Sequence, residues 1–132
     1  MDWQPLIERA KEARTHAYTP YSHFQVGACV LTDQGGLFGG CNVENAAYGP
    51  TCCAERVAIF AAIAGGARRI RALVVASGAA QPSAPCGVCR QVLREFADGD
   101  CPILCVNDAG IAWETTLEAL LPRSFGPEDL QQ

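Results

Sequence analysis

The chain has 132 residues, of which 49% are hydrophobic and 18% are charged. This length suits one domain with a hydrophobic core, and the composition excludes a disordered chain. The formal net charge of −4 argues against a protein that binds a polyanion, so a small-molecule substrate is favoured over DNA or RNA. We therefore expect residues 1–132 to form a single domain.

The apolar segments contain no pattern typical of export or of membrane insertion. Residues 1–20 mix charged residues with short apolar stretches and lack the apolar core of a signal peptide. The longest apolar run, residues 57–64, is too short to span a bilayer. The eight cysteines are therefore expected to bind metal or to remain buried free thiols, rather than to form disulfides. These features predict a cytoplasmic protein that does not bind membranes.

The first half of the chain is predicted to form a helix, a β-hairpin and a second helix. Asp2 can cap a first helix that continues to Ala17, with apolar residues recurring at helical spacing. Two strands, residues 24–32 and 37–43, flank a glycine-containing turn and form the hairpin. A helix over residues 53–64 is apolar on nearly every side and is therefore expected to be buried.

The second half is predicted to alternate strands and helices. The expected elements are a strand at 70–77, a helix at 88–97, strands at 101–107 and 111–114, and a helix at 116–121. Thr115 and Glu118 are expected to form a capping box for the last helix. This order predicts an α/β fold of three layers, α-β-α, in which helices cover a mixed central sheet of about five strands.

Three cysteines and one glutamate form the most informative pattern in the chain. Cys53 lies at the start of one expected helix, and Cys86 and Cys89 lie at the start of another, where the helix dipole favours thiolate. Both helices follow segments of one sheet, so their N-termini are expected to converge. Three thiolates with one open position describe a catalytic zinc, whereas a structural zinc normally has four protein ligands. Glu55 would then be the base beside the open position, and this spacing fits the zinc deaminase signature.

Other interpretations of these residues stay open. Cys86 and Cys89 could form a redox pair at a helix N-terminus, although this leaves Cys53 and Glu55 unexplained. A closed structural zinc site would need a fourth ligand, for which Cys41, Cys52 or Cys101 is available. The remaining cysteines are otherwise expected to be small buried hydrophobic residues: Cys29, Cys41, Cys52, Cys101 and Cys105.

Arg56 follows Glu55 directly. Three thiolates carry more negative charge than one Zn²⁺ neutralises, and a guanidinium that donates to a thiolate sulfur would withdraw part of this charge. The alternative for Arg56 is an ordinary arginine on a helix surface.

Segments along most of the chain resemble the cytidine deaminase family in its small zinc-thiolate form. Ala17–Ala28 is similar to the N-terminal segment of the family, and Gly40–Tyr48 is similar to its nucleoside-binding segment. Pro85–Gln91 matches the second zinc motif, and Leu121–Leu130 resembles the C-terminal tail. The four segments occur in the order of the family and without large gaps.

The resemblance implies one zinc ion per subunit, held by Cys53, Cys86 and Cys89, with Glu55 in proton transfer. It also implies that Asn42 and Glu44 hydrogen-bond the ribose hydroxyls. Further substrate-binding residues implied by the family are Ala54, Phe24 on the pyrimidine or sugar face, and Phe125. Apart from the resemblance, the sequence favours a plain core aromatic for Phe24, and Gln91 is expected to be helix scaffold only. The family resemblance further implies a homotetramer, with Tyr48 and Phe125 near a subunit boundary and Phe125 reaching the site of a neighbouring subunit.

The implied activity is hydrolytic deamination of cytidine and 2′-deoxycytidine to uridine and 2′-deoxyuridine, with release of ammonia, in pyrimidine salvage. The alternatives are deamination of a cytosine-nucleoside antibiotic and a non-catalytic structural zinc module. An editor of polynucleotides is disfavoured by the acidic charge and by the lack of a basic, aromatic strand-binding surface. A nucleotide substrate is disfavoured because the chain has no Gly-rich loop that would hold a phosphate.

Overall fold

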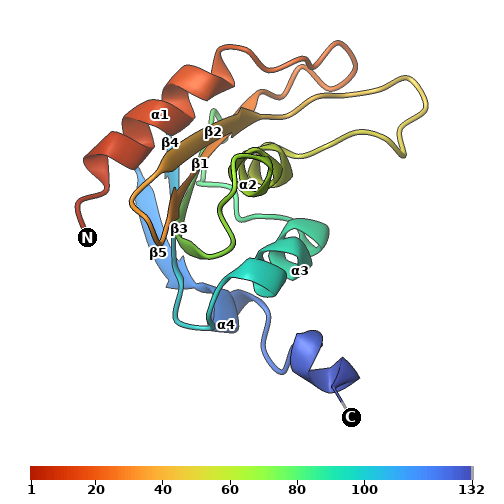
Figure 1. The fold of residues 1–132 in the computed structure, drawn as a ribbon. Helices are drawn as coiled ribbons and strands as arrows, with labels where there is room; N and C mark the ends of the chain where they lie inside the picture. Colours follow the sequence, from red (N-terminus) through yellow and green to blue (C-terminus); the bar gives the residue numbers. More distant parts are fainter. Residues whose placement is uncertain (132) are drawn as a thin grey trace.

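A mixed five-stranded sheet forms the centre of the molecule (Figure 1). The computed structural model describes residues 1–131, so the end of the predicted domain, Gln132, lies outside the described residues. The strands follow the order β2-β1-β3-β4-β5, in which β3 and β4 pair parallel and all other neighbours pair antiparallel. They are β1 (Val26–Thr32), β2 (Leu37–Cys41), β3 (Ile70–Ser77), β4 (Pro102–Asn107) and β5 (Ala112–Thr116).

Helices cover both faces of the sheet. One face packs against α1 (Gln4–Arg14), and the other packs against α2 (Ala54–Ala64) and α3 (Gly87–Phe96) (Figure 1). The short helix α4 (Leu117–Leu120) and the 3₁₀ helix η1 (Pro127–Leu130) follow β5. The predicted three-layer α/β fold with a mixed sheet is therefore confirmed. Within residues 1–131, no helix has the length and the apolar content needed to cross a membrane.

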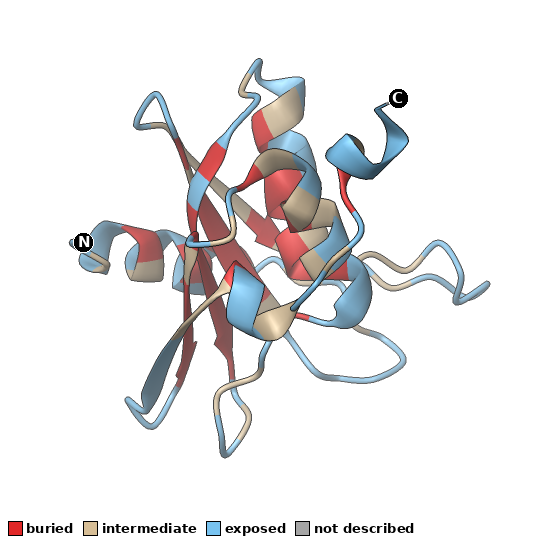
Figure 2. Cartoon of the chain, turned by 90° about the horizontal axis from the view of Figure 1, so that it is seen from below, coloured by how far each residue is buried: buried red, intermediate tan, exposed pale blue. Residues whose placement is uncertain are grey.

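The hydrophobic core lies in two layers, one on each side of the sheet (Figure 2). Side chains of a strand point alternately to its two faces, so β3 contributes to both layers. Leu73 and Val75 pack in the layer with Ile59 of α2, whereas Val74 packs in the layer with Leu6 of α1. Burial on both faces explains why the middle of β3 is a continuous apolar run, as expected for a central strand.

Two glycines allow the helices to approach the sheet closely. A Cβ on Gly27 of β1 would lie 2.0 Å from the carbonyl oxygen of Ala10 in α1. A Cβ on Gly40 of β2 would lie 2.4 Å from the backbone nitrogen of Ala58 in α2. Non-bonded atoms do not approach each other this closely, so any larger residue at either position would push a helix away from the sheet.

The first helix differs from the prediction at both ends. It ends at Arg14 rather than Ala17, because the next residues leave the helix and the backbone of Tyr18 pairs with the chain beyond β2. Its N-cap is Trp3, which makes no side-chain cap. The Asp2 carboxylate, one residue earlier, still accepts a hydrogen bond from the Gln4 N–H at 3.2 Å.

Two further predictions about helices are wrong. The helix α2 is not buried on every side, because Phe60 is 48% exposed and Ala61 and Ala64 are exposed beside it. The N-cap of α4 is Thr116, whose Oγ accepts from the N–H of Ala119 at 3.3 Å, and not Thr115. The strand β5 continues to Thr116, which moves the start of the helix by one residue.

Candidate active site

A cavity of about 310 Å³ lies where the N-termini of α2 and α3 meet the start of β1 and the segment after β2. Most of the predicted site residues line it together. The lining includes Ser22, Phe24, Asn42, Glu44, Thr51, Cys52, Cys53, Ala54, Glu55, Ser83 and Cys86. The structure therefore joins, in one cavity, side chains that lie up to 64 positions apart in the chain, from Ser22 to Cys86.

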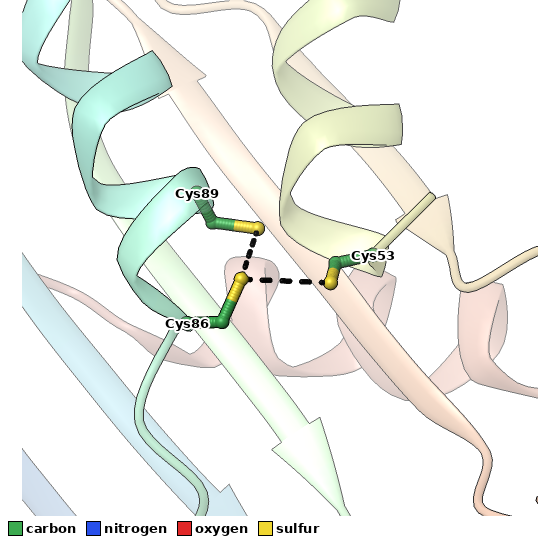
Figure 3. Close-up of side chains that lie close together, drawn as sticks. All are labelled: Cys53, Cys86 and Cys89. Carbon is green, nitrogen blue, oxygen red and sulfur yellow. Dashed lines mark hydrogen bonds between the residues drawn. The ribbon is translucent and has the colours of Figure 1, made fainter. Parts of the chain in front are cut away.

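Three thiols lie close together beside this cavity (Figure 3), and two of them, those of Cys53 and Cys86, line it. Cys53 and Cys86 are the N-caps of α2 and α3, and Cys89 lies in the first turn of α3. The Sγ–Sγ distances are 3.7 Å between Cys53 and Cys86, and 3.5 Å between Cys86 and Cys89. Tetrahedral zinc with Zn–S bonds of about 2.3 Å requires sulfurs about 3.8 Å apart. The three sulfurs therefore fit one tetrahedral zinc ion.

The other cysteines do not complete a closed site. Within residues 1–131, the group that could hold a metal consists of Cys53, Cys86 and Cys89 alone. All eight cysteines are free thiols. Burial raises the pKa of Cys101 and of Cys105 to about 12, which keeps these thiols protonated. The fourth position of a tetrahedral ion would therefore be open to a ligand from the cavity.

Charge at the thiols is concentrated on Cys53. Hydrogen bonds from the Cys89 thiol and from Arg56 together lower the pKa of Cys53 to about 5. Nη2 of Arg56 donates to Cys53 Sγ at 3.5 Å and to the carbonyl oxygen of Thr51 at 3.5 Å. Arg56 is half-buried and faces the thiols, so it is not the surface arginine of the alternative interpretation.

Glu55 lies in the first turn of α2, beside the thiols, and is 4% exposed. Burial raises the pKa of its carboxyl group to about 7, from an ordinary value of 4.5. A carboxyl group with such a pKa can accept and donate a proton near neutral pH. Since Glu55 and Cys53 line the same cavity, a ligand bound beside the thiols would also contact this carboxyl group.

The outer part of the cavity holds two polar side chains in fixed orientations. Asn42 Oδ1 accepts from the N–H of Val26 at 2.9 Å, and its Nδ2 donates to the carbonyl oxygen of Phe24 at 2.8 Å. Glu44 Oε1 accepts from the backbone N–H groups of Tyr21 and Ser22 at 3.0 and 3.1 Å. Each side chain keeps hydrogen-bonding capacity for a ligand, since an amide has two N–H groups and a carboxylate about four lone-pair sites.

Phe24 and Phe125 lie in different surroundings. Phe24 lines the cavity and is 42% exposed, so the core-aromatic interpretation is wrong. Phe125 is 58% exposed and is not among the residues that line the cavity of its own chain. It belongs to a C-terminal segment that extends away from the body of the molecule beyond α3 (Figure 1).

Side chains of α3 hold this C-terminal segment through contacts that were not predicted from the sequence. Nε2 of Gln91 donates to the carbonyl oxygen of Phe125 at 2.9 Å. Nε of Arg94 donates to Ser124 Oγ at 2.8 Å, and its Nη2 pairs with Glu128. Gln91 is therefore more than helix scaffold. Its contact joins residues 34 positions apart and leaves no local pattern in the sequence.

Ser22, Ser83 and Cys52 also line the cavity without having been predicted there. Cys52 is half-buried and not the small core residue that its type suggested. Ser22 had one usable signal, since it lies two residues before Phe24 in a segment that resembles the family. A position in a loop does not by itself predict which side chain the serine contacts.

Comparison with known proteins shows to which family this chain belongs. The model of the cytidine and deoxycytidylate deaminase zinc-binding region matches residues 2–105, which include all three thiols and Glu55. The chain belongs to the cytidine deaminase family. It is 48% identical to a cytidine deaminase of Sporosarcina psychrophila over 130 residues, covering 98% of this chain and 96% of that protein. A cytidine deaminase of Halalkalibacterium halodurans is 45% identical over 130 residues, covering 98% of each chain.

Solved structures of the family have the same fold. The cytidine deaminase of Burkholderia pseudomallei has a TM-score of 0.90 and 46% identity, covering 95% of this chain and all (100%) of that one. The enzyme of Mycobacterium tuberculosis has a TM-score of 0.81 and 40% identity, covering 96% and 98% of the two chains. The predicted family and the prediction of a hydrolytic deaminase enzyme are therefore confirmed.

Proposed function

We propose that this chain, as a single catalytic domain, hydrolyses cytidine and 2′-deoxycytidine to the uracil nucleosides and ammonia. The observation that carries the proposal is one cavity that joins two thiols of a three-thiol cluster, a buried carboxyl group with a pKa of about 7, and two fixed polar side chains. Relatives and structural neighbours that are named cytidine deaminases support the substrate. In the cytoplasm this reaction would serve pyrimidine salvage.

Cys53, Cys86 and Cys89 would hold one zinc ion per subunit, with Arg56 donating to the Cys53 sulfur. When bound in such a site, zinc lowers the pKa of a coordinated water molecule. The three thiolates reduce the positive charge that the ion presents. Arg56 offsets part of this reduction, because its guanidinium withdraws charge from a thiolate.

Glu55 would transfer the two protons that the reaction requires. As a carboxylate it takes a proton from the attacking water and delivers it to the ring nitrogen N3 of cytosine. It then takes the remaining proton from the hydroxyl group now on C4 and delivers it to the amino group, so that the C4–N bond breaks, ammonia leaves and the C4 carbonyl of the uracil ring forms. A pKa of about 7 suits both steps, because the carboxyl group changes protonation state readily near neutral pH.

The remaining lining residues would hold the nucleoside. Phe24 would pack on the pyrimidine or sugar face, and Ala54 would contact the base from the first turn of α2. Asn42 and Glu44 would hydrogen-bond the sugar hydroxyls, because both keep free donor or acceptor positions.

Four subunits would complete the site, with Phe125 of one subunit reaching the cavity of another. Two exposed aromatic residues support an assembly: Phe60 on the outer face of α2 and Tyr48, which is 75% exposed in the loop before α2. Phe60 is exposed together with Ala61 and Ala64 on α2, and apolar residues exposed together on one helix face typically mark a protein interface. Phe125 supports it as well, because it is exposed on a segment that extends from the body (Figure 1).

The deciding experiment mixes zinc-loaded protein with cytidine and follows both the ultraviolet change and the release of ammonia. We expect wild-type protein to form uridine and ammonia in equal amounts. Glu55→Gln should bind zinc and fold as before, but should lose roughly 10²–10⁴-fold in kcat, because it removes the group that transfers the protons.

Other outcomes of this experiment have clear meanings. Near-native turnover by Glu55→Gln would refute the role of Glu55. No turnover of cytidine by zinc-loaded wild type would refute the proposed substrate. A panel of modified cytosine nucleosides would then distinguish an antibiotic deaminase from a structural zinc module.

A further inference from the structure

The Glu44 carboxylate is held by the loop of residues 19–24, and Ser22 makes two of the contacts. Its backbone N–H and that of Tyr21 both donate to Oε1 of Glu44, at 3.1 and 3.0 Å. The Ser22 hydroxyl donates to the other oxygen, Oε2. Both Ser22 and Glu44 line the cavity that Cys53, Cys86 and Glu55 also line.

The direction of the Ser22 hydroxyl is determined by a further contact. Oγ of Ser22 accepts from the N–H of Phe24 at 3.0 Å, so its own proton is free to point to Glu44. A serine hydroxyl has one proton to donate, and that of Ser22 is donated to Glu44. The hydroxyl thus connects Glu44 to the backbone of Phe24, the aromatic residue that lines the same cavity.

The contacts leave little freedom to the carboxylate. A carboxylate offers about four lone-pair sites, two on each oxygen. Two backbone donors use those of Oε1, and Ser22 uses one of those of Oε2. One lone pair of Oε2 remains for a ligand. The Ser22 hydrogen bonds also lower the pKa of Glu44, which keeps this acceptor ionised near neutral pH.

We propose that Ser22 is a positioning residue that aims the free lone pair of Glu44 at one sugar hydroxyl of the substrate. The inference rests on the proposed function, in which Glu44 binds the sugar. If cytidine and 2′-deoxycytidine are both substrates, the hydroxyl must be present in both, so it is the 3′- or the 5′-hydroxyl. Ser22 then determines how strongly the enzyme discriminates against a nucleoside that lacks this sugar hydroxyl.

The test compares Ser22→Ala and Glu44→Gln on cytidine, 3′-deoxycytidine and 5′-deoxycytidine. Glu44→Gln identifies the hydroxyl, because its effect on KM disappears with the analogue that lacks this group. Ser22→Ala should raise KM for cytidine about 10-fold, with kcat changed less than about 2-fold, since a hydrogen bond to a charged group is lost. Its effect should disappear with the same analogue.

Ser22→Thr is the matched control, because it keeps a hydroxyl at the position and should restore KM for cytidine. Thermal unfolding and zinc content should be unchanged in the Ser22 variants, since Ser22 is exposed. If Ser22→Ala does not fold, Ser22→Cys serves as the second variant, because a thiol is a poor donor to a carboxylate.

An equal loss on all three nucleosides would overturn the inference, because it would indicate a general structural role of Ser22. An unchanged KM would overturn it too. Failure of the wild type to deaminate cytidine would instead refute the proposed function, and the inference would fall with it.

Discussion

At the scale of the residue, Glu55 is subject to two opposing effects. The N-terminus of a helix favours a carboxylate by about 0.3–1 kcal/mol, because the helix dipole is positive there. Burial disfavours the charged form, and the rise in pKa from 4.5 to about 7 corresponds to roughly 3 kcal/mol. Burial is therefore the larger effect. A position that is 4% exposed at the start of α2 produces a carboxyl group suited to proton transfer.

This pKa predicts a pH dependence of stability in the metal-free protein. The folded state favours the protonated form of Glu55, so its contribution is complete below the ordinary pKa of 4.5 and is lost as the pH rises to about 7. Relative to Glu55→Gln, which does not titrate, wild type should lose up to about 3 kcal/mol over this range. Urea unfolding of both proteins at several values from about pH 5 to about pH 8 measures the difference.

The comparison with Glu55→Gln removes the contributions of the groups that titrate in both proteins and do not interact with Glu55. A difference in unfolding free energy that stays constant over this range would contradict the raised pKa. A difference that grows in favour of wild type as the pH rises would contradict its direction.

At the scale of the element, α2 brings Cys53, Glu55 and Arg56 into the site within four consecutive residues. The position of this helix depends on Gly40 in β2, whose missing side chain leaves room for the backbone of Ala54 and Ala58. The site therefore depends on a glycine that does not line the cavity. A shift of the helix by one ångström would move Cys53, Glu55 and Arg56 together, and with them the proposed metal ligand and the proposed proton-transfer residue.

Gly40→Ala should thus reduce both stability and metal binding. Its Cβ would lie 2.4 Å from the nitrogen of Ala58, and overpacking of this kind typically costs about 1–3 kcal/mol. Thermal unfolding and zinc content measure the two effects. The matched control is Gly49→Ala, whose Cβ would meet only the Ala47 carbonyl oxygen at 3.9 Å. Wild-type values of both quantities in Gly40→Ala would show that the helix does not depend on this glycine.

At the scale of the whole molecule, the single chain leaves an apolar helix face uncovered. The sequence predicted α2 to be buried on nearly every side, and the single chain buries only the side that packs on the sheet. The conflict disappears if the outer face of α2, with Phe60, Ala61 and Ala64, packs against other subunits of the proposed tetramer. The apolar content of α2 then predicts the burial of this helix in the whole assembly, and not only in the single chain.

A charge on this face should prevent assembly. Phe60→Glu would place a carboxylate in an apolar interface, so we expect light scattering on a gel-filtration column to show a smaller species than wild type. Activity per subunit should fall with it, because Phe125 would no longer reach a neighbouring site. Lys11→Glu reverses an exposed charge on α1, across the sheet, and should leave the assembly intact. A Phe60→Glu protein with the wild-type mass would exclude α2 from the interface.

The sequence predicted the features that depend on local patterns. Apolar periodicity located the five strands and four helices, because burial of one or two faces acts on neighbouring residues directly. The thiol cluster was predictable as well, since helix N-termini that follow strands of one sheet meet at its end. These parts of the fold and of the site follow from short segments of chain.

Features that depend on distant partners were not predictable in this way. The first helix ends at Arg14 because Tyr18 pairs with residues around Asn42, and no residue near Arg14 signals this pairing. The contacts from Ser22 to Glu44 and from Gln91 to Phe125 also join segments that are far apart in the sequence. Their residue types are common in loops and helices, so only the three-dimensional fold identifies the partners.

The two ends of α3 contact different parts of the molecule, and this has a thermodynamic consequence. The first turn supplies Cys86 and Cys89, and later turns hold the segment of Phe125 through Gln91 and Arg94. If zinc binding orders the start of the helix, it also strengthens the hold on the segment that would reach another subunit in the proposed tetramer. Linkage is reciprocal, so assembly must then tighten zinc binding by the same factor. Subunits that have lost their metal would be the first to leave the assembly, and the intact oligomer would be enriched in metal-loaded chains.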